Sequence, residues 1–108
     1  MRKTTFKIPI YGGKITVVEC DSLKEVEQIY NLVNTSGCSA ISFINPKDEN
    51  YIMAFEVNHK HGTVAHESMH VVGLIFKDIY AKLDIDNDEP FCYLLGWIVD
   101  KVHMFLKT

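Results

Sequence analysis

Residues 62–76 read Gly62-Thr-Val-Ala-His-Glu-Ser-Met-His-Val-Val-Gly-Leu-Ile-Phe76, and the rest of the chain is arranged around this stretch. Its apolar residues recur every three or four positions, which predicts a helix that starts at Gly62 or Thr63 and runs to about Leu83. Thr63 is the expected N-cap. Apolar residues lie nearly all around the helix axis, so most of this helix should be buried.

Toward the N-terminus, the sequence has the pattern of a β-hairpin. Apolar residues alternate with others over residues 6–10 and again over 15–17, and Gly12 and Gly13 between them suit a tight turn. Pro9 has no backbone N–H to donate to a neighbouring strand. The first strand should therefore lie at an edge of the sheet.

Two further strands are predicted between the hairpin and the long helix. Residues 38–45 are largely apolar, as in an interior strand, and residues 51–57 carry a second strand-like pattern. The connection over residues 45–50 is rich in Asn, Pro and Asp, which are turn residues. A short turn of this kind favours antiparallel pairing of the two strands.

Two more helices complete the pattern. Ser22 and Glu25 fit a capping box, and a helix over roughly 22–35 is expected from apolar residues at helical spacing: Leu23, Val26, Ile29, Tyr30 and Val33. Pro90 marks the start of a final helix that carries Phe91, Leu94, Leu95, Ile98, Val99, Val102 and Phe105. The order ββαββαα over residues 1–108 predicts one α+β domain, with a small antiparallel or mixed four-stranded sheet packed on three helices.

Composition excludes several classes of function. The net charge is −3 and the 11 lysines and arginines are scattered, so the chain lacks the basic surface that binding to nucleic acid requires. Neither a membrane span nor a signal peptide is visible, and we expect a cytoplasmic protein. Cys20, Cys38 and Cys92 form no CxxC pair, which favours reduced and mostly structural thiols.

The long helix carries a metal-binding pattern, His66-Glu67-Ser68-Met69-His70 or H-E-x-x-H. Two histidines four residues apart lie on one helical face, so both imidazoles can reach one ion, and Glu67 can hold a water on that ion. The alternative is a pair of exposed or core histidines with no ligand. Burial of two imidazoles and a carboxylate would cost several kcal/mol, which a divalent cation would offset, so the metal site is favoured.

A third ligand is expected from the next helix. Glu89 stands at the predicted start of that helix, beyond an irregular connection. If residues 82–88 return the chain toward the ion, the carboxylate of Glu89 completes the protein ligands of a zinc site.

These residues resemble the gluzincin branch of zinc metallopeptidases, in which H-E-x-x-H is followed by a glutamate on a later helix. The small size resembles the minigluzincins, and residues 88–97 and 6–11 are similar to short metallopeptidase-like proteins encoded by phages and prophages. The resemblance implies a minimal zincin-like fold and one Zn²⁺ per chain, held by His66, His70 and Glu89. It also implies a peptide or protein substrate, Glu67 as the general base, and the bacterial host cytoplasm as location.

The same resemblance implies that an edge strand above the metal helix binds the substrate. The best match is the strand that precedes this helix, with Tyr51, Met53, Phe55 and Val57. One position departs from the family. Larger members have an aspartate four residues after the glutamate ligand, where this chain has Tyr93.

Other polar residues near the expected site each have two interpretations. Tyr93 could orient a ligand or stabilise an oxyanion, as could His103, whereas a core tyrosine and a solvated histidine are the simpler interpretations. His59 and His61 could line the cleft or belong to a polar loop.

The alternative function is a non-catalytic metalloprotein, in which the ion ties two helices together and the surface serves assembly or inhibition in a phage particle. Its partner would be another phage protein or a second copy of the chain. Such a structural site would close its fourth position with a protein ligand, for which Cys92 is a candidate. A general base is unnecessary there, so Glu67 distinguishes the two functions.

Overall fold

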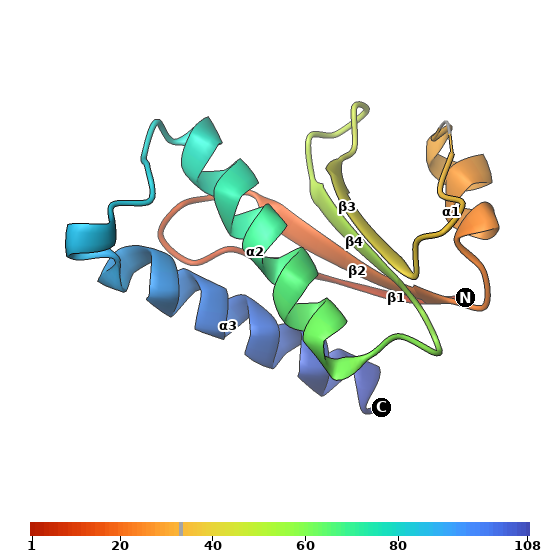
Figure 1. Ribbon diagram of the computed structural model, residues 1–108. Coiled ribbons are helices and arrows are strands. Elements are labelled where there is room, and N and C mark those ends of the chain that lie inside the picture. Colours follow the sequence, from red (N-terminus) through yellow and green to blue (C-terminus); the bar gives the residue numbers. More distant parts are fainter. Residues whose placement is uncertain (33) are drawn as a thin grey trace.

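The computed structural model describes residues 1–32 and 34–108. Its elements are, in chain order, β1 Arg2–Lys7, β2 Lys14–Cys20, α1 Leu23–Tyr30, β3 Ala40–Ile44, β4 Tyr51–Glu56, α2 His61–Asp78, a 3-10 turn η1 Ile85–Asn87 and α3 Glu89–Leu106. Figure 1 shows α2 and α3 together on one side of the sheet. The predicted α+β class and the order ββαββαα are confirmed.

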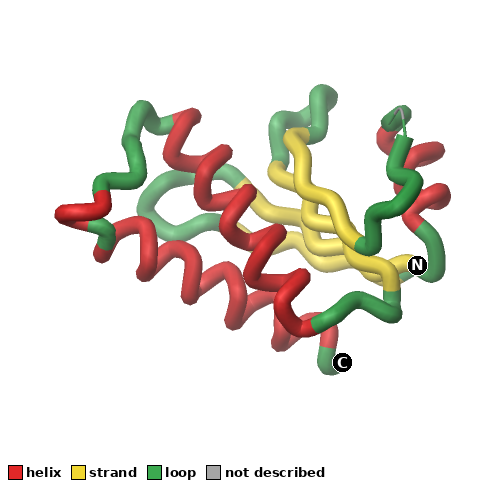
Figure 2. The backbone as a smooth tube through the Cα atoms, viewed as in Figure 1, coloured by secondary structure: helices red, strands yellow, loops and turns green. Residues whose placement is uncertain are grey.

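The four strands form one mixed sheet in the order β1-β2-β4-β3 (Figure 2). The β1–β2 hairpin is antiparallel, β2 and β4 are parallel, and β3 and β4 are antiparallel, as the turn between them favours. The prediction that the first strand lies at an edge is confirmed, with Pro9 in the turn that follows it.

The expectation that residues 51–57 form the edge strand is wrong. Strand β4 lies inside the sheet, where β2 pairs with one side of it and β3 with the other, so its backbone cannot receive a peptide. Residues 51–55 are buried on both faces, and they carry no charged side chain, which is typical of an interior strand. The apolar strand β3, expected inside, is the edge strand.

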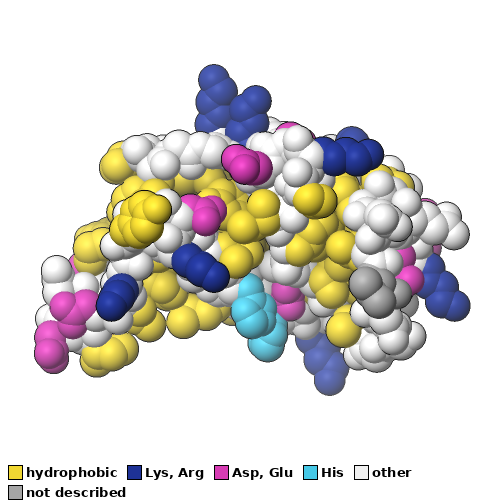
Figure 3. Space-filling view, turned by 90° about the horizontal axis from the view of Figure 1, so that it is seen from above, with side chains coloured by type: hydrophobic (Ala, Val, Ile, Leu, Met, Phe, Trp, Pro, Cys, Tyr) yellow, Lys and Arg dark blue, Asp and Glu magenta, His cyan; other side chains and the backbone are white. Residues whose placement is uncertain are grey.

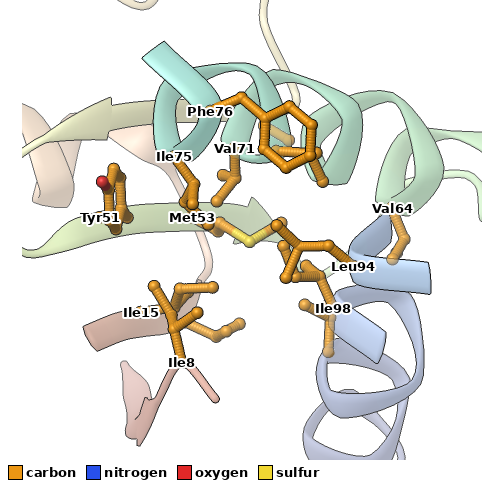
Figure 4. Close-up of a cluster of buried hydrophobic side chains, with 14 of the residues drawn as sticks. Ile8, Ile15, Tyr51, Met53, Val64, Val71, Ile75, Phe76, Leu94 and Ile98 are labelled. Atoms are coloured by element: carbon orange, nitrogen blue, oxygen red, sulfur yellow. The ribbon is translucent and has the colours of Figure 1, made fainter. Parts of the chain in front are cut away.

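Alternation along the strands builds two hydrophobic clusters, one on each face of the sheet. Ile15, Val17, Met53 and Phe55 pack beneath α2 and α3 in the larger cluster, part of which Figure 4 shows. The intervening residues of β2 and β4 pack against α1 in the smaller cluster: Val18, Cys20, Ile52 and Ala54. The larger cluster fixes α2 across the sheet, and α2 carries the predicted metal ligands.

Helix α1 starts as predicted but ends early. Ser22 is its N-cap, and the capping box with Glu25 is present. The helix ends at Tyr30 because Asn31 adopts a left-handed conformation and the N–H groups of Asn31 and Leu32 both donate to the carbonyl of Glu27. Val33, also predicted to be helical, lies outside the described residues.

Helix α2 is displaced toward the N-terminus from its predicted bounds. It begins at His61 with Lys60 at the N-cap, so the assignment of Thr63 as the cap is wrong. It ends at Asp78, because Tyr80 adopts a positive φ of 61° and the N–H of Ala81 donates to the carbonyl of Phe76. Within the part of the chain described, neither this helix nor any other is long and apolar enough to cross a membrane.

Helices α2 and α3 run antiparallel along each other (Figure 1). The rings of Phe76 and Phe91 pack edge to face with centroids 5.2 Å apart, which joins the C-terminal end of α2 to the start of α3. The C-terminal end of α3 consequently lies beside the first turns of α2.

Candidate metal centre

Helix α2 brings His66, Glu67 and His70 together on one face. The potential ligand atoms of these three side chains all lie within 4.8 Å of one another. The two Nε2 atoms of His66 and His70 are 3.2 Å apart, because residues i and i+4 stand one helical turn apart. Figure 3 shows histidine side chains gathered in one exposed group on this face of the molecule.

This geometry fits a tetrahedral metal ion. Zinc binds imidazole nitrogen at about 2.0–2.1 Å, so two such nitrogens on one ion are separated by about 3.3 Å. The observed Nε2–Nε2 distance of 3.2 Å is close to that value. Imidazole nitrogen and carboxylate oxygen are also a donor set that zinc accepts. The three residues are therefore close enough, and of the right chemistry, to bind a metal ion.

Glu67 is buried, whereas His66 and His70 are both exposed, so the expected burial of two imidazoles is wrong and only the carboxylate is taken out of water. The His66 side chain is 67% exposed and that of Glu67 only 8%. The hydroxyl of Ser42 on β3 donates to Oε1 of Glu67 over 2.7 Å, and Oε2 of Glu67 lies 3.8 Å from Nε2 of His66. One carboxylate oxygen is thus fixed against the sheet, while the other is directed toward the histidines.

Ser42 is a site residue that the sequence interpretation missed. It pairs with Met53 across β3 and β4, so it lies on the face that carries the larger cluster beneath α2. A serine at an inward position of an otherwise apolar strand, Ala40–Ile44, is the signal that could have pointed to it. This serine becomes informative only when α2 is known to be the helix that faces β3.

Two hollows flank the candidate site along β3. One, of about 470 Å³, lies toward the start of α2 and is lined by Lys60 and Thr63. The other, of about 400 Å³, extends toward Ser42 and His70. Four residues line both hollows: Cys38, Ala40, His66 and Glu67. A ligand that follows the edge of the sheet would consequently pass over the three clustered side chains.

The structure does not bring Glu89 to this cluster, so the expectation of a third ligand there is not met. Phe91 packs on Phe76, which lies about 9 Å farther along α2 than His70 at 1.5 Å per residue. Because α3 runs antiparallel to α2, Glu89 lies beyond Phe76 and is solvent-exposed. The connecting loop extends past the end of α2 instead of returning along it (Figure 1).

The other candidates on α3 are also outside the cluster. Tyr93 is 76% exposed, so it is not a core residue, and it lines neither hollow beside the cluster. His103 is half-buried near the C-terminal end of α3 and lines neither hollow. Cys92 is exposed on the first turn of α3 and also lies apart from His66 and His70.

Ser68, between the two histidines, gives a prediction about stability. It is fully buried in line with Val64 and Val72, and its Oγ has no hydrogen-bond partner within the described residues. Ser68→Ala should raise the free energy of unfolding by about 1 kcal/mol, because a buried hydroxyl without a partner costs about 1–3 kcal/mol. Thermal unfolding should show a Tm higher by about 4–8 °C, and a lower Tm would show that the hydroxyl is hydrogen-bonded.

The fold and the site together define an α+β protein with a candidate metal-binding group on one helix. Comparisons with known proteins found no family model, no curated protein and no solved structure that matches the chain. Support for a function therefore comes from the site itself.

Proposed function

We propose that this chain is a small zinc-dependent metallopeptidase. The observation that carries the proposal is the state of Glu67: a buried carboxylate, fixed on one side by Ser42, with its other oxygen 3.8 Å from a histidine nitrogen. Simple metal storage would not need an oriented carboxylate beside the two histidines. A general base must lie within reach of the water from which it takes a proton.

Zinc is the proposed metal because two imidazoles with a neighbouring carboxylate are typical of zinc hydrolases. His66 and His70 would hold the ion through Nε2. When bound, zinc supplies Lewis acidity that polarises a carbonyl group and lowers the pKa of water.

Each residue of the site then has a task in peptide hydrolysis. Oε2 of Glu67 accepts a proton from the attacking water and later gives it to the leaving amine. Ser42 keeps the carboxylate in one orientation through Oε1. Within the described residues β3 pairs only with β4, so its outer edge offers backbone groups to an extended peptide. The substrate strand that was expected at β4 is accordingly proposed at β3.

The alternative, a metal-stapled phage protein without activity, receives less support. A structural staple needs no general base, whereas Glu67 is buried and one of its carboxylate oxygens lies 3.8 Å from Nε2 of His66. In that alternative, the partner would be a phage protein or a second copy of the chain. For either function, the proposed location is the bacterial host cytoplasm.

Removal of the metal tests the proposed function. Protein purified without chelator should contain about one zinc per chain, and a mixture of unstructured peptides should be cleaved, as mass spectrometry of the products would show. Dialysis against a chelator should abolish cleavage, and an equimolar amount of zinc should restore it. Equal cleavage by the chelated and the zinc-loaded protein would refute the proposal.

A further inference from the structure

We propose that Cys38 is a third protein ligand of the ion held by His66 and His70. The inference rests on the proposed metal site and extends it to the loop before β3. Zinc would then have two nitrogen ligands and one sulfur ligand, with a fourth position left for water or substrate.

The cluster is short of protein ligands for a catalytic zinc ion. Catalytic zinc sites have three protein ligands and one open position. If Glu67 acts as the base, only His66 and His70 remain for the ion, and Glu89 lies at the other end of α2. A third ligand must come from elsewhere.

Cys38 lies beside the cluster. It lines both hollows beside the cluster, each time together with His66 and Glu67. Apart from Cys38, the side chains in these two linings that bind zinc through nitrogen, sulfur or carboxylate oxygen are the members of the cluster itself. Among the described residues that line the two hollows, Cys38 is therefore the one zinc-binding side chain outside the cluster.

Hydrogen bonds hold the loop on both sides of Cys38. The backbone N–H and the hydroxyl of Thr35 both donate to Oε2 of Glu27 on α1, and these hydrogen bonds lower the pKa of the Glu27 carboxyl. After Cys38, the carbonyl of Ser39 accepts from the N–H of Glu56 on β4. These hydrogen bonds hold Cys38 beside α2 even when no metal ion is bound.

Ligation requires the Cys38 side chain to move toward the two histidines. The Sγ of Cys38 is not among the atoms within 4.8 Å of one another, so the side chain must turn into the hollow that it lines. Cys38 is exposed and has no disulfide, so little packing opposes this rotation. The thiol binds as a thiolate, and its proton passes to solvent.

The other two cysteines differ from Cys38 and provide controls. Cys20 is buried, its thiol donates to the carbonyl of Phe55, and burial raises its pKa to about 11. Cys92 is exposed like Cys38 but lies on α3, away from the cluster. Cys92→Ser is consequently the matched control for Cys38→Ser.

Two measurements on the intact protein test the proposal without an assay of activity. Alkylation by iodoacetamide, followed by peptide mass spectrometry, should slow at least about tenfold at Cys38 when zinc is added, with the rate at Cys92 unchanged. Cobalt in place of zinc should give a thiolate-to-cobalt charge-transfer band in the near ultraviolet. The band should be absent in Cys38→Ser and present in Cys92→Ser.

The outcomes distinguish failure of the Cys38 proposal from failure of the proposed metal site. Cobalt bound with its visible bands but without charge transfer, and with equal alkylation of Cys38 with and without zinc, would overturn the Cys38 proposal and leave the histidine site intact. Failure of the wild-type protein to bind either metal would overturn both proposals. Because the alkylation assay uses the wild-type chain, its result does not depend on how well Cys38→Ser folds.

Discussion

Glu67→Gln is expected to lower the rate of peptide hydrolysis by roughly 10²–10⁴-fold, the contribution of a positioned general base, while zinc remains bound. The amide has nearly the shape of the carboxylate and keeps one oxygen to accept the hydrogen bond from Ser42. It cannot take a proton from water. The loss should therefore fall on the rate constant kcat, with zinc content still about one per chain.

Glu89→Gln is the matched control for this variant. It removes an exposed carboxylate that the sequence pointed to as a ligand and that the structure places at the other end of α2. Zinc content and hydrolysis should both be unchanged. Hydrolysis at the wild-type rate in Glu67→Gln would mean that another group is the base, and the proposed mechanism would be wrong.

The candidate cluster was predictable because its geometry is local. The spacing of His66 and His70 determines their separation once the helix forms, and the apolar residues around them are sufficient to predict that helix. The capping box of Ser22 and Glu25 is equally local and is present as predicted. Interactions within one or two helical turns can be read from a single sequence.

The arrangement of the strands was harder to predict because pairing is not local. Strand β4 pairs in parallel with β2 across the α1 and β3 segments, so its interior position depends on contacts between distant residues. A short apolar run suits either an interior strand or an edge strand. The role of Ser42 follows only when β3 is known to be the edge beside α2.

Glu89 shows the same limit for helices. Its place in the chain, just after a polar loop, is compatible with a loop that returns to the ion and with one that extends past α2. The contact of Phe76 with Phe91 selects the second arrangement. Burial of two aromatic rings contributes more stabilising free energy than the placement of one solvent-exposed carboxylate. Only the packing of α2 on α3 distinguishes these two cases.

Replacement of either histidine by alanine, His66→Ala or His70→Ala, should weaken zinc binding by more than 100-fold. Loss of a group that merely orients a ligand already costs about 10–100-fold in affinity, and loss of the ligand itself must cost more. Competition with a chromogenic chelator measures the dissociation constant. His61→Ala, at the first residue of the same helix and also exposed, should bind zinc like the wild type.

Zinc-dependent stability supplies a second measure of the same variants. Because the His66 side chain is 67% exposed, its loss should change the free energy of unfolding of the metal-free protein by no more than about 0.5 kcal/mol. At a zinc concentration of 100 Kd, the wild-type protein should gain about 2.7 kcal/mol, since the ion binds the folded state. That gain should disappear in His66→Ala and persist in His61→Ala. If zinc stabilised His66→Ala and the wild type equally, the ion would bind without His66, and the proposed pair of histidine ligands would be wrong.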